Sequence, residues 1–169
     1  DNILGVVISN TWAWSVEGTS LDAFSAIFPM PQMEQRVLNE NFFVINLMLK
    51  NTNEKSRNNP AIKDAYMMAL PTPASRLGTA IFPQQMAISK NWLNNIEERL
   101  PVLFGKPIEF IFGEKDFNSG SPAAIARWRS HFPYADIQLV PNGCHFIQED
   151  SPESFNFALQ KILVKLNNQ

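Results

Sequence analysis

The sequence has 169 residues and a mass of 19.1 kDa, which is enough for one hydrophobic core but too little for two substantial domains. Hydrophobic residues make up 45% of it and charged residues 18%, so the composition excludes a disordered chain. The formal net charge of -2 argues against binding to nucleic acid or to anionic membranes, because no basic surface is available to neutralise phosphates. Cys144 is the one cysteine, which excludes an intramolecular disulfide, and no stretch is apolar enough to span a membrane. We therefore expect a cytoplasmic protein.

Three apolar runs predict the strands of a parallel sheet, at residues 3–8, 107–112 and 135–140. The first two are almost continuously apolar and rich in β-branched or aromatic residues, which is typical of strands buried on both faces. The third is shorter and ends at a Pro-Asn-Gly turn cluster. The first run starts at once, without Met or a signal sequence, so we expect the sequence to begin in the middle of a fold.

Helices are predicted between and after these strands. Ser121-Pro122 has the form of an N-cap followed by proline at the first helical position, and Ser151-Pro152 repeats it before an amphipathic C-terminal stretch. Residues 20–100 contain no convincing strand but show helical patterns at 35–49, 60–70 and 88–100, as expected for a helical lid. The predicted organisation is a core strand and loop over 1–19, a helical cap and returning helix over 20–100, and a core β-α-β-α unit over 101–169.

Asp116 and His145 are the strongest candidates for acid-base chemistry. Each follows the carboxyl end of a predicted strand, the edge at which open α/β sheets place their ligands, so a contact between them is expected. Such a carboxylate fixes the tautomer of the imidazole and leaves its other nitrogen as a general base. Asp116 could instead only begin the turn that contains Asn118 and Ser119. The other histidine, His131, suits the C-terminal end of a helix and is not expected to be functional.

Other kinds of site are not supported by the sequence. No glycine belongs to a G-x-[Ser/Asp/Cys]-x-G nucleophile elbow, and Cys144 is better explained as a small hydrophobic residue than as a nucleophile. Two histidines without a third ligand at suitable spacing make no zinc site, and neither a phosphate-binding loop nor a dinucleotide fingerprint is present. We expect neither a metal nor a cofactor.

Several motifs together resemble those of haloalkane dehalogenases. They are Gly113-x-x-Asp116, the run Gly-Cys-His-Phe-Ile-Gln-Glu-Asp-Ser-Pro-Glu at 143–153, and the segments at 6–14 and 41–44. The resemblance covers the carboxyl-terminal half of that family and implies a partial α/β-hydrolase fold: the sixth strand, a helical cap, and the strands of the acid and the histidine. It also implies Asp116 as the triad acid and His145 as the base, because the family's alternative acid position falls near Asn10, which cannot ionise.

The resemblance further implies an activity that this sequence cannot complete by itself. The nucleophilic aspartate that displaces halide and forms an alkyl ester has no counterpart here, so we expect a hydrolase-type chain that is inactive alone. Its expected partners are a nucleophile-bearing half, a small apolar substrate and further copies of itself. Trp12, Trp14 and Phe146 are the candidate substrate-binding residues, although large aromatic residues more often pack in a core, as we expect for Trp92.

Two alternatives stay open. The chain could be half of another α/β-hydrolase, such as an epoxide or ester hydrolase or a beta-lactone decarboxylase, because the acid-histidine pair does not select the reaction. It could also be a non-catalytic binding or assembly module.

Overall fold

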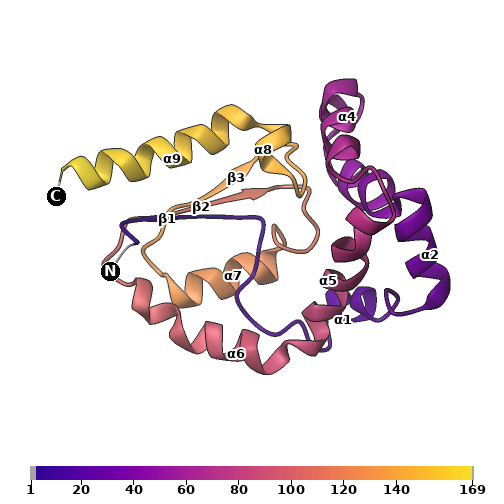
Figure 1. The fold of residues 1–169 in the computed structure, drawn as a ribbon. Coiled ribbons are helices and arrows are strands. Elements are labelled where there is room, and N and C mark those ends of the chain that lie inside the picture. The colour runs from indigo at the N-terminus through magenta and orange to yellow at the C-terminus, as the bar shows by residue number, and fades with distance from the viewer. Residues whose placement is uncertain (1–2, 169) are drawn as a thin grey trace. The chain divides into compact units, whose positions relative to one another are not determined.

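The computed structural model describes residues 3–168, which form two compact units (Figure 1). The first unit holds the residues up to Trp12, a short return at Asn51–Asn53, and the chain from Arg99 onward. The second unit holds Ala13–Lys50 and Glu54–Glu98. The candidate acid and histidine therefore belong to the same unit.

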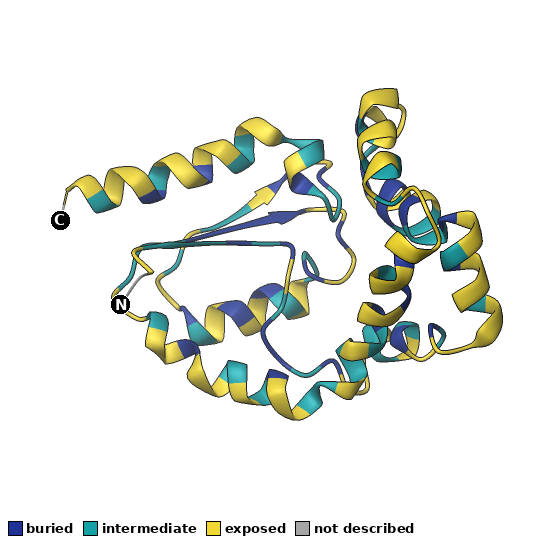
Figure 2. Cartoon of the chain, viewed as in Figure 1, coloured by how far each residue is buried: buried dark blue, intermediate teal, exposed yellow. Residues whose placement is uncertain are grey.

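The first unit contains the predicted parallel sheet. Strands β1 (Val6–Ser9), β2 (Ile108–Gly113) and β3 (Ile137–Val140) lie in the order β1-β2-β3, with both neighbouring pairs parallel. This confirms the prediction of a short parallel sheet. The first strand begins three residues later than predicted, since its first backbone bond runs from the N–H of Val6 to the carbonyl of Pro107. Strand β2 lies in the middle of the sheet and is buried from Glu109 to Gly113, as its dark colour in Figure 2 shows.

Helices cover both faces of this sheet (Figure 1). On one face lies α7 (Pro122–His131), whose Trp128 ring packs 5.2 Å from Phe110 of β2. On the other face lie α8 (Ile147–Asp150) and α9 (Pro152–Asn167), where Ile111, Ile147 and Ala158 share a buried cluster. Alternate residues of β2 thus face opposite helical layers, as expected for a strand buried on both faces.

The two predicted helix starts differ in detail. Ser121 caps α7 as predicted, since its hydroxyl accepts a hydrogen bond from the N–H of Ala124 at 3.3 Å. Ser151 does not cap α9: its hydroxyl donates instead to Ser154 Oγ at 2.7 Å. The helix still begins at Pro152, because proline fixes the backbone angle φ that the first turn requires.

One charged residue is buried within the sheet. Glu109 of β2 is only 2% exposed, and its carboxylate accepts hydrogen bonds from Lys161 Nζ at 2.5 Å and Lys165 Nζ at 2.6 Å. Lys161 also donates to Asp136 at 3.2 Å. Both lysines lie on α9, so this cluster joins the helix to the central strand and pairs the buried carboxylate of Glu109 with two ammonium groups.

The second unit is built from helices joined by turns and loops, and its described residues form no strand. It contains the helices α1 (Ser20–Ser25), α2 (Pro31–Glu40), α3 (Glu54–Arg57), α4 (Pro60–Ala69) and α5 (Leu77–Ile88), most of α6 (Lys90–Arg99), the π-helix η1 (Phe43–Met48) and the 3-10 helix η3 (Ala74–Arg76). The 3-10 helices η2 (Leu49–Asn51) and η4 (Leu100–Leu103) lie where the chain passes between the units. The hydrophobic core of the second unit contains the buried residues Phe28, Val37 and Ala80.

The helical pattern predicted over 35–49 is not one helix. It breaks at Asn41, whose φ of 51° lies in the left-handed region that ends a helix. Helix α5 was not predicted, because Pro83 lies inside it; Pro83 is buried, and its carbonyl accepts a hydrogen bond from Ser25 Oγ at 2.8 Å. No helix in the described part of the chain has the length and apolar character that crossing a bilayer requires.

Candidate active site

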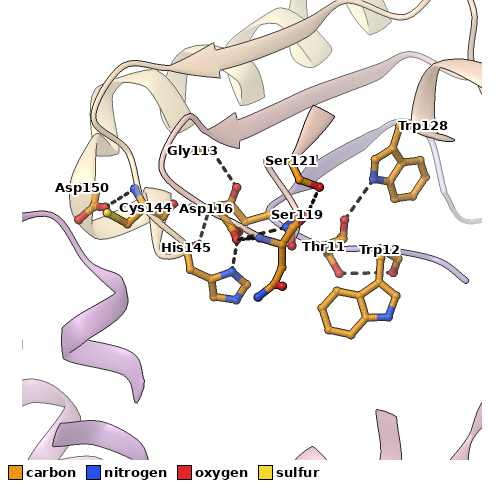
Figure 3. A network of polar contacts seen from close by, with 12 residues as sticks. Thr11, Trp12, Gly113, Asp116, Ser119, Ser121, Trp128, Cys144, His145 and Asp150 are labelled. Atoms are coloured by element: carbon orange, nitrogen blue, oxygen red, sulfur yellow. Dashed lines mark hydrogen bonds and ion pairs between the residues drawn. The ribbon is translucent and has the colours of Figure 1, made fainter. Parts of the chain in front are cut away.

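The structure brings Asp116 and His145 into direct contact. Asp116 lies in the turn that follows β2, and His145 lies in the loop between β3 and α8. Because β2 and β3 are parallel neighbours, both loops leave the same edge of the sheet. His145 Nδ1 is 2.8 Å from Asp116 Oδ2. Figure 3 shows the imidazole turned toward this carboxylate, with the contact drawn as a dashed line.

Asp116 also organises the turn in which it lies. Its other carboxylate oxygen, Oδ1, accepts hydrogen bonds from the N–H groups of Asn118 at 3.0 Å and Ser119 at 3.2 Å. The two interpretations of Asp116 from the sequence, partner of histidine and start of a turn, are therefore both present, one on each oxygen. The turn fixes the carboxylate and thereby directs Oδ2 at the imidazole.

The surroundings keep Asp116 ionised. The side chain is 4% exposed, and this burial acts to raise its pKa. The hydrogen bond and charge interaction with His145, together with the N–H groups of Asn118 and Ser119, outweigh burial and hold the pKa of Asp116 below its ordinary value of 3.8. A carboxylate only accepts hydrogen bonds, so His145 Nδ1 must be the donor. In the neutral ring, Nε2 then carries the free lone pair.

This arrangement can perform general base chemistry. The His145 side chain is 39% exposed, so its ring can be reached from outside the core. Nε2 can take a proton from water or a hydroxyl group, and Asp116 then stabilises the imidazolium that forms. Glycine at position 113 allows this geometry, because a Cβ there would lie 2.2 Å from the carbonyl oxygen of Cys144 in the histidine loop.

The other aromatic candidates lie in different environments. The ring of Phe146 stands edge-on to His145, with centroids 5.1 Å apart. Trp12 is half-buried in the first unit, and Trp14 is buried in the second. A role in substrate binding stays a prediction for all three. Trp92 is 64% exposed, so the prediction that it packs in a core is wrong.

Trp128 and Cys144 have structural contacts. The indole N–H of Trp128 is buried and donates to the carbonyl of Thr11 at 3.1 Å, which joins α7 to the segment after β1 (Figure 3). Cys144 is half-buried, and its backbone N–H donates to Asp150 Oδ2 at 2.7 Å. Within residues 3–168, no group of three or more His, Cys, Asp and Glu side chains is arranged to hold a metal ion.

Sequence reasoning missed the environment of Asn10. It identified the position only as one where an acid is lacking, whereas the structure places the Asn10 amide, 6% exposed, against the histidine loop. Its partner Cys144 lies 134 positions away in sequence, and no local pattern reports a contact of that range.

Comparison with known proteins finds haloalkane dehalogenases among the curated relatives. The chain is 32% identical over 160 residues to the haloalkane dehalogenases 2 of Mycobacterium bovis and Mycobacterium tuberculosis, covering 94% of this chain and 55% of each relative. It thus spans about half the length of the curated relatives it matches. No protein-family model matches the chain.

Solved structures agree on the fold. The haloalkane dehalogenase DbeA from Bradyrhizobium elkani matches with a TM-score of 0.78 at 16% identity, over 98% of this chain and 60% of that one. A thermophilic esterase from Thermogutta terrifontis matches with a TM-score of 0.68 at 19% identity, over 98% and 57%. The resemblance seen in the sequence is confirmed: the chain is similar to haloalkane dehalogenases and corresponds to the carboxyl-terminal half of an α/β-hydrolase.

Proposed function

We propose that this chain supplies the acid and the histidine of a hydrolase of the haloalkane dehalogenase type. The observation that carries the proposal is the 2.8 Å hydrogen bond between His145 Nδ1 and an Asp116 carboxylate that its turn holds ionised. In this function His145 is the general base, and Asp116 orients it and balances its charge.

The reaction has two steps. A carboxylate nucleophile displaces halide from an sp³ carbon, so a carbon–oxygen bond forms, the carbon–halogen bond breaks, and an alkyl ester of the enzyme results. His145 Nε2 then takes a proton from water while the water oxygen attacks the ester carbonyl. The tetrahedral intermediate expels the alcohol, which takes up the proton from the imidazolium, and the carboxylic acid that remains on the enzyme releases its proton to solvent, which regenerates the carboxylate.

The nucleophile belongs to sequence outside these 169 residues. No strand-turn-helix elbow motif occurs here to carry it, so the chain alone is expected to release no halide. Its partner in this proposal is a nucleophile-bearing segment of an α/β-hydrolase. The substrate is small and apolar, because Phe146 stands beside the His145 ring and an alkyl group fits such a surface.

The test measures halide release from a bromoalkane. The chain is produced alone and also joined to a nucleophile-bearing segment, the amino-terminal part of a curated relative. We expect release only from the joined protein, and a loss of steady-state turnover in its His145→Ala variant. Unchanged turnover in that variant would remove His145 from the mechanism.

A second candidate is a non-catalytic assembly module. The observation in its favour is that α9 carries exposed apolar side chains, among them Phe157, Leu163 and Val164. Such residues in one helix favour association with another protein surface. The same preparations discriminate the two candidates: a defined dimer in sedimentation, with no halide release after joining to a nucleophile-bearing segment, would favour assembly.

A further inference from the structure

We propose that Asn10 is a positioning residue for His145, which it holds through the backbone of the histidine loop. The effect of Asn10 on catalysis rests on the proposed function. Its effect on the position of the His145 imidazole does not. Asn10 directly follows β1, which is the neighbour of β2 in the sheet. The acid follows β2 and the histidine follows β3, so Asn10 reaches the histidine loop from the end of the remaining strand.

The Asn10 amide uses both ends of its side chain. Its Nδ2 donates to the carbonyl oxygens of Cys144 at 2.7 Å and His145 at 2.5 Å. Its Oδ1 accepts from the N–H of Gly113 at 2.8 Å, at the end of β2. One buried side chain therefore ties the loop of the histidine to the strand that precedes Asp116.

The remaining backbone groups of the loop are held from other directions. The N–H of Cys144 donates to Asp150 Oδ2 at 2.7 Å, and the N–H of His145 donates to the carbonyl of Asn51 at 3.0 Å. All four polar backbone groups of Cys144 and His145 are thus bonded. Asn10 satisfies both carbonyls, so its loss leaves two acceptors without these partners and frees the peptide to rotate.

The residue type at position 10 follows from two requirements. Its φ is 40°, in the left-handed region that asparagine tolerates better than most residues. The contacts also require an acceptor for Gly113 and donors for two carbonyls, which a primary amide provides together. Aspartate has nearly the same shape but would set a carboxylate against two carbonyl oxygens.

The ring is sensitive to this placement. His145 Nδ1, which makes the 2.8 Å bond to Asp116, belongs to a ring attached through Cβ to the Cα of His145. This Cα is bonded to the carbonyl carbon whose oxygen accepts from Asn10. Rotation of that peptide shifts the ring relative to a carboxylate that the turn at Asn118 and Ser119 keeps fixed. Asn10 therefore acts on the reaction through the backbone of His145.

The test compares two Asn→Gly variants of the full chain. Asn10→Gly removes the amide while glycine accepts the positive φ. Asn41→Gly is the matched control, because Asn41 is also buried, has a φ of 51° and donates through its amide, but lies in the second unit. The readout is the Nδ1 proton of His145 in protein labelled with ¹⁵N-histidine, with His131 as the internal reference.

We expect the hydrogen-bonded Nδ1 proton in the parent and in Asn41→Gly. In Asn10→Gly we expect it to be lost to exchange with water, with the ring divided between both tautomers. Asn10→Asp, which changes almost no volume, should lose the signal too. A folded Asn10 variant that keeps the parent signal would overturn the proposal.

Turnover separates this inference from the proposed function. In the chain joined to a nucleophile-bearing segment, Asn10→Gly should lower kcat by about 100-fold with little change in KM, as expected for a ring misplaced by about 1 Å. A lost Nδ1 signal in a joined protein that releases no halide would support the positioning role and contradict the proposed function. Parent kcat and signal in Asn10→Gly would contradict the positioning role alone.

Discussion

The substitution Gly113→Ala should displace the histidine loop. An alanine Cβ at this position would lie 2.2 Å from the carbonyl oxygen of Cys144 and 2.5 Å from that of Gly143. Real Cβ contacts are essentially never shorter than 3.0 Å, and backbone atoms cannot rotate away as a side chain can. The loop must therefore withdraw by about 1 Å, a displacement that costs roughly 100-fold in rate in an active site. His145 directly follows Cys144, so its ring moves with the loop. The hydrogen bond between His145 and Asp116 is then lost.

The expected loss of stability is about 1–3 kcal/mol, the usual cost of overpacking a close contact. It is measured by urea unfolding followed by tryptophan fluorescence, with the histidine Nδ1 proton as the second readout. Gly78→Ala is the control, because a Cβ there meets nothing within 4 Å and α5 should gain about 0.5–1 kcal/mol. A Gly113→Ala variant with parent stability and an unchanged His145 signal would refute the reasoning.

Further predictions concern charge and capping. Removing both lysines that contact Glu109, by Lys161→Met and Lys165→Met, should cost about 3–5 kcal/mol in urea unfolding, whereas Glu109→Met should cost less, since the partly exposed lysines can reach water. The pKa of Asp116 is lowered on folding, so its carboxylate stabilises the fold above pH 3.8, and this contribution is lost as pH falls through the folded pKa. In Asp116→Asn, the free energy of unfolding should therefore fall less steeply with decreasing pH in the acid range. The pKa of Lys161 is raised, mainly by its hydrogen bond to Glu109, so the charged lysine stabilises the fold below pH 10.5, and this contribution is lost as pH rises through the folded pKa. In Lys161→Met, the free energy of unfolding should therefore fall less steeply with increasing pH in the alkaline range. Ser121→Ala should cost about 1 kcal/mol in thermal or urea unfolding, through loss of the α7 cap.

The sheet and the contact between acid and histidine could be predicted because their signals are local. Continuous β-branched and aromatic runs indicate buried parallel strands, and the carboxyl ends of neighbouring parallel strands meet at one edge. The contact of Asp116 with His145 followed from these two rules, and the structure has it at 2.8 Å. The catalytic roles of both residues stay predictions.

The remaining features depend on contacts between distant parts of the chain. The left-handed turn at Asn41 interrupts an apolar pattern that continues on both sides, so the pattern alone favours one helix. Pro83 lies inside α5 with its side chain buried and its carbonyl bonded to Ser25 Oγ, and helix propensity does not report such tertiary contacts. Asn10 meets the histidine loop across 134 positions of sequence, and Gly113 meets it from the end of the neighbouring strand, so neither role is visible in a local motif.

The most direct test of the proposed role of His145 is a search for the covalent ester. The His145→Ala variant of the chain, joined to a nucleophile-bearing segment, is incubated with a bromoalkane and analysed by intact-protein mass spectrometry. We predict one equivalent of halide and a mass increase of one alkyl group that persists, because no base remains to activate water. An ester that turns over at the parent rate, or no adduct in a joined protein whose parent releases halide, would contradict the role of His145.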